Sequence, residues 1–227
     1  PENENGYEPS HNGNGYCGLI ALTHNYNNYR EYLEVKLSQP LQKDHLYCVQ
    51  FYVSNASGFD STGSVVTPQG LAVNGMGAYF SATLLSDLTG VGPVLNVQPQ
   101  IINPPSHLLA EENGWELITG IYSAAGGEEY MTIGNFLNDA TTDDSLIVPA
   151  FFLNSQAFYY VDDVSVTDMN ISVNQLPDDT TLCDGETITL NATNPQASSY
   201  LWQDQSTNPV YTVHGPGIYK VQVVFDC

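Results

Sequence analysis

The feature that most restricts the fold of this sequence is a set of short runs in which apolar residues occupy every second position. Residues 32–37 and 46–53 show it most clearly, and in the second run Tyr47, Val49 and Phe51 occupy every second position. Successive side chains of a β-strand point to opposite faces, so this spacing predicts strands with one buried face. Gly, Asn, Pro and Ser separate these runs and favour tight turns between them.

Such runs recur along the whole chain, and no stretch keeps a helical apolar spacing beyond about two turns. Further strands are expected at 77–84, 94–102, 115–123, 129–136, 146–152, 157–167, 187–190, 200–203, 210–213 and 218–224. Many short strands at this spacing predict an all-β protein, a jelly-roll β-sandwich followed by a small Ig-like β-sandwich. The pattern breaks after Asp168. We therefore expect a first domain at 1–168, a linker at 169–173 and an Ig-like domain at 174–227.

The charge balance excludes two classes of partner. The 227 residues carry 25 acidic and 4 basic side chains, a net charge of −21. Such a surface repels nucleic acid phosphates and anionic lipids, and no apolar run approaches the roughly 20 residues that span a bilayer. The charge suits calcium, which prefers carboxylate ligands, although solubility in a salty medium is the favoured explanation.

The four cysteines, Cys17, Cys48, Cys183 and Cys227, form two widely separated pairs without zinc-finger spacing. Three pairings are formally open, and the simplest joins each pair within its own domain, Cys17–Cys48 and Cys183–Cys227. Disulfides indicate an oxidising compartment, so we expect a secreted or cell-surface protein. Because no signal peptide is present, we expect the mature or an excised form of an exported chain.

Motifs for catalysis are missing from the sequence. The histidines are scattered, no nucleophile elbow or phosphate-binding loop occurs, and the cysteines are better used as bridges. Adjacent acids on a strand point to opposite faces, so no neighbouring pair supplies the opposed carboxylates of a glycosidase. We predict a protein that is not an enzyme, with a glycoside hydrolase as the least favoured alternative.

Two acidic positions suggest a structural calcium ion. Asp162 and Asp163 interrupt an aromatic and β-branched run at 158–166, so one of them must face inward. Glu31 shares a face with Leu33 and Val35, so its carboxylate is also expected to face inward. A buried carboxylate needs a partner, and with few bases a cation is the natural candidate. The alternative is that all three lie at strand ends and reach water.

Tyrosine is abundant, with 15 residues, and several lie beside asparagine in the segment 24–29. A flat ring with a polar edge suits a sugar-stacking or adhesive surface because little side-chain entropy is lost. Tyr26, Tyr29 and Tyr52 are the candidate ligand contacts. The alternative is that these rings belong to the core.

Several longer motifs resemble a known family of surface proteins. They are Gly13–Gly18, Tyr29–Leu37, Leu46–Val53, Gly126–Phe136 and Tyr159–Val166, then Leu182–Leu190, Tyr200–Trp202 and Gly215–Val223. The first five resemble a jelly-roll, carbohydrate-binding-module-like domain, and the last three are similar to Ig-like or PKD-like modules. Both occur in type IX secreted, gliding-associated cell-surface proteins of Bacteroidota.

The resemblance implies several properties. In jelly-roll carbohydrate-binding modules an Asp of the last strand helps hold a structural calcium, which points to the Asp162–Asp163 pair. Exported proteins of this phylum are often O-glycosylated after Asp, which makes Ser61, Ser145 and Thr180 candidate acceptors in expected loops. Family members usually carry a further first strand, so residues 1–15 are expected to leave a sheet edge open to a strand from a neighbouring molecule.

Three functions follow from these expectations. The leading one is a non-catalytic extracellular module of a bacterial cell-surface adhesin or fibre, with a structural, adhesive or self-assembling role. The alternative is a calcium-stabilised glycan-binding module, and the third is a glycoside hydrolase. The expected partners are neighbouring domains or copies of the same surface protein, together with surface glycans.

Overall fold

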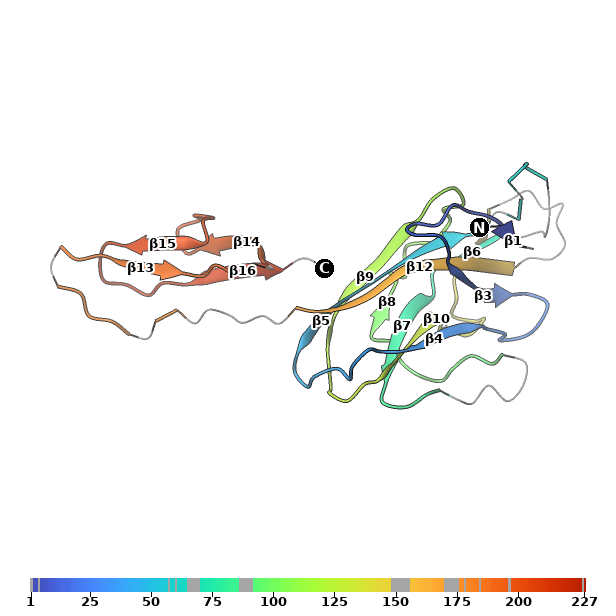
Figure 1. The fold of residues 1–227 in the computed structure, drawn as a ribbon, viewed down its shortest axis with the longest axis horizontal. Helices are drawn as coiled ribbons and strands as arrows, with labels where there is room; N and C mark the ends of the chain where they lie inside the picture. The colour runs from blue at the N-terminus through green and yellow to red at the C-terminus, as the bar shows by residue number, and fades with distance from the viewer. Residues whose placement is uncertain are drawn as a thin grey trace. The chain divides into compact units, whose positions relative to one another are not determined.

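The fold comes from a computed structural model that divides the chain into two compact units, Pro1–Asp168 and Met169–Cys227 (Figure 1). The structure describes residues 2–3, 5–56, 58–59, 61–64, 70–85, 92–147, 156–169, 176–177, 179–183, 185–195, 197–225 and 227. Most of the predicted linker, residues 170–173, and most of the predicted strand 146–152 lie outside the described residues.

Every regular element of the described residues is a β-strand, which confirms the prediction of an all-β protein. In the first unit these are β1 (Glu2–Asn3), β2 (Gly6–Tyr7), β3 (Cys17–Thr23), β4 (Tyr32–Lys36), β5 (Leu46–Asn55), β6 (Leu71–Val73), β7 (Met76–Ser81), β8 (Ile101–Ile102), β9 (Glu116–Ser123), β10 (Tyr130–Asn135), β11 (Asp144–Leu146) and β12 (Gln156–Asp168). The second unit contains β13 (Ile188–Asn191), β14 (Ala197–Trp202), β15 (Val210–Val213) and β16 (Val221–Phe225). No helix long and apolar enough to cross a membrane occurs among the described residues.

Two antiparallel sheets form the body of the first unit. Their strand orders are β3-β12-β5-β9 and β4-β10-β7-β8, and their inner faces share one apolar core (Figure 1). The alternation in the sequence explains which side chains are inside. Val49, Phe51 and Val53 of β5 are at most 1% exposed, while Gln50 and Tyr52 between them face outward and are only partly buried.

The longest strand, β12, lies in the interior of its sheet. Its first half pairs with β3, from Gln156 opposite Thr23 to Val161 opposite Cys17. On its other edge it pairs with β5 along most of its length. Inside the core, the Tyr159 hydroxyl accepts the Val73 N–H at 2.9 Å and donates to the Leu109 carbonyl at 2.7 Å.

The second unit is small. Its two two-stranded antiparallel sheets are β13-β15 and β14-β16. Leu190, Ala192, Trp202 and Val213 form its core, and Trp202 is 1% exposed. The Trp202 Nε1–H donates to the carbonyl of Asn208 at 2.7 Å, which satisfies the one polar group that this ring buries.

The predicted cysteine pairing is wrong. Cys17 and Cys183 are free thiols, so neither predicted bridge is present, whereas Cys48 and Cys227 are both disulfide-bonded cysteines. Cys17 stands opposite Val161 of β12 and Cys48 opposite Thr167. About 20 Å of strand therefore separates the two cysteines. A disulfide needs Cα atoms within about 7 Å, so the fold forbids Cys17–Cys48.

The second predicted bridge fails for a similar reason. Cys183 precedes the start of β13. Phe225, two residues before Cys227, pairs with Ala197, which follows the end of β13. The two cysteines thus lie at opposite ends of the second unit, and Cys183–Cys227 does not form.

Candidate functional site

The Asp162–Asp163 pair lies at an irregularity of β12. The register between β12 and β5 shifts between Asp162 and Ser165, and Asp163 adopts a left-handed φ of 47°. Asp is among the few non-glycine residues that adopt this conformation readily. The bulge lets both carboxylates reach one neighbouring segment, although adjacent residues of a regular strand would point apart.

That segment is the turn at His11 and Asn12. Asp162 Oδ2 accepts the N–H of His11 at 2.9 Å and that of Asn12 at 3.3 Å. His11 Nδ1 lies 2.5 Å from Asp163 Oδ2, and the His11 ring stacks on Tyr52 with centroids 3.7 Å apart. The acidic pair therefore fastens the N-terminal segment to the outer face of the sheet.

Glu31 satisfies its carboxylate elsewhere. Its Oε2 accepts the N–H of Ile20 at 2.8 Å, and its Oε1 accepts the hydroxyl of Tyr29 at 2.9 Å. Ile20 pairs with Phe158, four residues before Asp162 along β12. Thus the structure does not bring Glu31 together with the Asp162–Asp163 pair. No group of three His, Cys, Asp or Glu side chains within the described ranges is arranged to hold a metal ion.

Two of the three candidate tyrosines lie together. Tyr26 is 62% exposed, and its ring centroid lies 6.0 Å from that of the half-buried Tyr29. Tyr52 is on the outer face of β5, where its ring stacks on His11 and not on Tyr26 or Tyr29. The candidate ligand surface is therefore the loop of residues 24–29, which we call the Tyr–Asn loop, without Tyr52.

The Tyr–Asn loop is held by a buried arginine. Arg30 is fully buried, and its Nη1 donates to the Tyr29 carbonyl at 2.8 Å and to Asp139 Oδ1 at 3.0 Å. Its Nη2 donates to the Leu137 carbonyl at 2.8 Å. Asp139 Oδ2 also accepts the Asn28 N–H at 2.7 Å, and Asn28 Oδ1 accepts the Asp139 N–H at 3.0 Å. Charge-assisted bonds of this kind fix the base of the loop.

No role was assigned to Arg30 from the sequence. A signal was available: Arg30 directly precedes an alternating strand in a chain with only four Lys and Arg residues. An arginine at the start of a predicted strand is a candidate for burial in an acid-rich chain. Its planar guanidinium suits buried ion pairs with carboxylates.

A second group that the sequence did not reveal involves three glutamates. Glu8 is 4% exposed, and burial together with the neighbouring Glu111 raises its pKa from 4.5 to about 7. Burial and Glu111 also raise the pKa of Glu112, whose Oε1 has no hydrogen-bond partner within the described part of the chain. Burial in this group therefore disfavours the charged forms of Glu8 and Glu112.

An open groove runs between the edges of the two sheets. It has a volume of about 290 Å³ and is lined mainly by β4, the segment after it and the end of β12. Val35 of β4 and Val164 of β12 border it and are 51% and 43% exposed. Two aliphatic side chains thus remain in water on facing sheet edges. We call this feature the edge groove.

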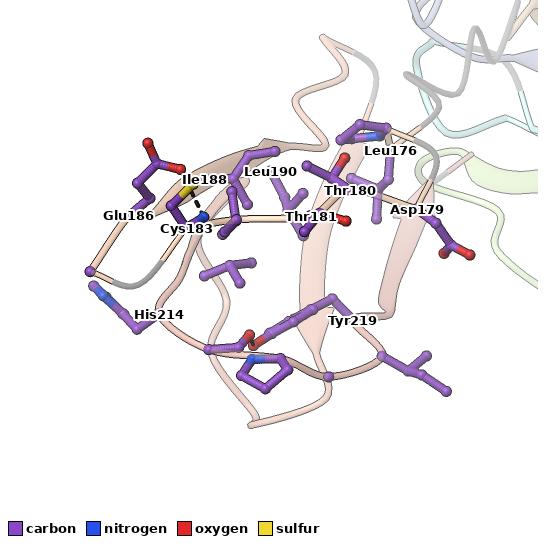
Figure 2. A pocket seen from close by; sticks show the side chains of 18 residues that line it. Leu176, Asp179, Thr180, Thr181, Cys183, Glu186, Ile188, Leu190, His214 and Tyr219 are labelled. Atoms are coloured by element: carbon purple, nitrogen blue, oxygen red, sulfur yellow. Dashed lines mark hydrogen bonds between the residues drawn. The ribbon is translucent and has the colours of Figure 1, made fainter.

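The second unit contains a larger cavity of about 700 Å³ (Figure 2). Ile188 and Leu190 supply apolar wall, and Asp179, His214 and Tyr219 also surround the space in Figure 2. The turn from Cys183 to Glu186 closes one side, where Glu186 Oε2 accepts the Cys183 N–H at 2.9 Å and the Glu186 N–H donates to the Cys183 carbonyl at 3.0 Å. Because its lining carries acids and no Lys or Arg, the cavity disfavours anionic ligands.

The three candidate glycosylation sites are exposed. Ser61 and Thr180 lie outside regular strands, as expected, but Ser145 lies in the short strand β11 and not in a loop. All three hydroxyl-bearing residues remain accessible, so glycosylation stays a prediction.

No family model, no curated protein and no solved structure matches this chain. The Tyr–Asn loop, the edge groove and the cavity of the second unit are the features of the described residues that could bind a ligand or a partner.

Proposed function

We propose that the chain is a non-catalytic extracellular module of a cell-surface adhesin or fibre, and that the Tyr–Asn loop is its contact surface. The observation that carries this proposal is the rigid presentation of an exposed tyrosine. Tyr26 projects at 62% exposure from a loop whose base is fixed by the buried Arg30 and by Asp139. A preorganised aromatic ring loses little entropy on binding and supplies a large contact area.

Other features support an extracellular role. The chain contains disulfide-bonded cysteine, and disulfides persist mainly in oxidising compartments. The two units are all-β, and the net charge of −21 keeps such a surface soluble in salt. The resemblance to type IX secreted surface proteins points the same way. Neighbouring domains or copies of the same protein are the expected partners.

A glycan ligand is the second candidate, because an exposed tyrosine beside asparagine amides combines ring stacking with hydrogen bonding. In this version a structural calcium ion accompanies the fold, as the resemblance implies. Asp162, Asp163 and Glu31 hold protein partners in the structure, so calcium has to compete with these contacts.

The test measures adsorption of the disulfide-intact chain to polysaccharide-coated and uncoated sensor surfaces. We expect Tyr26→Ala to weaken binding at least about tenfold, in line with loss of a central aromatic contact. Tyr7→Ala is the matched control, since Tyr7 is also exposed, at 40%, but lies in β2 outside the loop. Binding that both variants reduce equally would refute the assignment of the loop.

The same preparation tests the absence of catalysis. The chain is incubated with a panel of polysaccharides, and the release of reducing ends is measured. We expect no release above the buffer. Release that disappears when one carboxylate is replaced by its amide would show a glycoside hydrolase and overturn the proposal.

A further inference from the structure

The edge groove lies between two sheet edges that no strand of the described residues covers. β3 pairs with β12 only as far as Val161, so the β3-side edge of β12 from Val164 to Thr167 has no strand beside it among the described residues. β4 is the terminal strand of the opposite sheet, and its outer edge is likewise without a strand in the described part of the chain.

The chemistry of the groove specifies an extended peptide. Unpaired N–H and C=O groups along a sheet edge are a template for another strand. The open part of β12 and the strand β4 are each four to five residues long, which is about 15 Å and the length of an ordinary strand. Val35 and Val164 border the same space and offer contacts for aliphatic side chains at alternate positions.

The charges of the groove and of the chain restrict the occupant further. Lys36 and Asp168 border the groove, but Lys36 Nζ lies 3.0 Å from Glu129 and Asp168 Oδ2 lies 2.9 Å from His45. Both charges are thus already paired. The side chains of a bound peptide that face the groove therefore need no charge. A second copy carries the same net charge of −21 and is repelled at close range. The occupant is therefore neutral or basic.

We propose that the edge groove binds an extended strand of a partner polypeptide by β-augmentation. The strand is five to six residues long, carries aliphatic side chains at alternate positions and presents Lys or Thr to solvent. It adds to the free edge of β12 and covers Val164 and Val35. This interaction is independent of the Tyr–Asn loop and gives the module a second way to join a larger assembly.

The probe is a fluorescein-labelled peptide, Lys-Thr-Val-Thr-Val-Thr-Val-Lys, titrated with the disulfide-intact chain and followed by anisotropy. Its matched control replaces the central Val by Pro, which removes a donor that a strand pair needs. We expect saturable binding of the first peptide and at least about tenfold weaker binding of the second. On binding, hydrogen exchange of the amides of residues 164–167 should slow.

Variants locate the site. Val164→Lys and Val35→Lys should each weaken peptide binding at least about tenfold, because each places a charge in the apolar groove. Ile121→Lys is the matched control, since Ile121 is a 46%-exposed aliphatic residue of β9, away from the groove. All three side chains are well exposed, so their replacement leaves the fold intact, which a thermal melt verifies. Tyr26→Ala should leave peptide binding unchanged.

Three results would overturn the inference. The first is no binding of the valine peptide up to about 1 mM. The second is equal binding of the proline peptide or of the Val164→Lys variant. The third is a dimer of the free chain in sedimentation that Val164→Lys abolishes, because the occupant would then be a second copy and not a basic partner strand.

Discussion

Glu8→Gln should make the first unit more stable at pH 8 and leave its stability unchanged at pH 4. Glu8 is 4% exposed, and its pKa rises from 4.5 to about 7 on folding because of burial and of Glu111. The folded state therefore disfavours the charged form. The stability that protonated Glu8 contributes to the folded state is fully present below pH 4.5 and is lost as the pH rises through about 7. At about 1.4 kcal/mol per pKa unit, the loss is about 3 kcal/mol.

The assay is urea unfolding followed by tryptophan fluorescence, with wild type and variant compared at pH 4 and pH 8. The chain has two tryptophans, Trp115 in the first unit and Trp202 in the second, so a Trp202→Phe background reports the first unit alone. Asp179→Asn is the control, because it removes one exposed acid from the second unit. Comparison at each pH cancels the self-repulsion that all the other acids contribute.

Glu111→Gln tests the cause. It removes the neighbouring charge that raises the pKa of Glu8, so the gain from Glu8→Gln should shrink in its presence. A Glu8→Gln variant with the same stability difference at pH 4 and pH 8 would refute the reasoning, since a group that does not titrate between these values cannot have a pKa near 7.

Three further predictions concern the packing and the cysteines. Arg30→Met should destabilise the first unit by about 1–3 kcal/mol in urea unfolding, because it leaves two partly buried carbonyls and the 39%-exposed Asp139 without their donor; a cost below about 0.5 kcal/mol would show that the network is dispensable. Gly77→Ala should cost about 1–3 kcal/mol, since its Cβ would lie 2.4 Å from the Ile101 carbonyl oxygen, and an unchanged melting temperature would contradict this contact. Alkylation without reductant should label Cys17 and Cys183 alone, as peptide mapping will show; a label on Cys48 in the unreduced protein would exclude the bridge.

The sequence was sufficient for the fold class because alternation is a local property. The predicted strand at residues 46–53 became β5, whose inward residues Val49 and Phe51 are completely buried. The same logic missed β6, which is three residues long, and predicted a strand at 94–102 where only the two residues of β8 form one. All three residues of β6 are buried, so its side chains do not alternate and only its pairing with β11 reveals it.

The site was harder to predict because it depends on strand register. Asp162 and Asp163 were predicted as calcium ligands, which stays a prediction, and in the structure they contact the turn at His11, about 150 residues earlier in the chain. The pairing of Cys17 and Cys48 was wrong for the same reason, since β12 holds them at distant positions. The burial of Arg30 depends on Asp139 and Leu137 from a distant loop, which no local pattern contains.

The position of β12 also determines the order in which the first unit can be built. This strand separates β3 from β5, although both precede it in the chain by about 100 residues or more. Among the described strands, β3 pairs within its sheet with β12 alone, and β5 pairs with β9 and β12, so residues 156–168 have to arrive before β3 is paired. Contacts between such distant segments slow folding because loop closure costs entropy before pairing repays it. The first unit therefore assembles late and cooperatively, as its final strand enters the middle of an unfinished sheet.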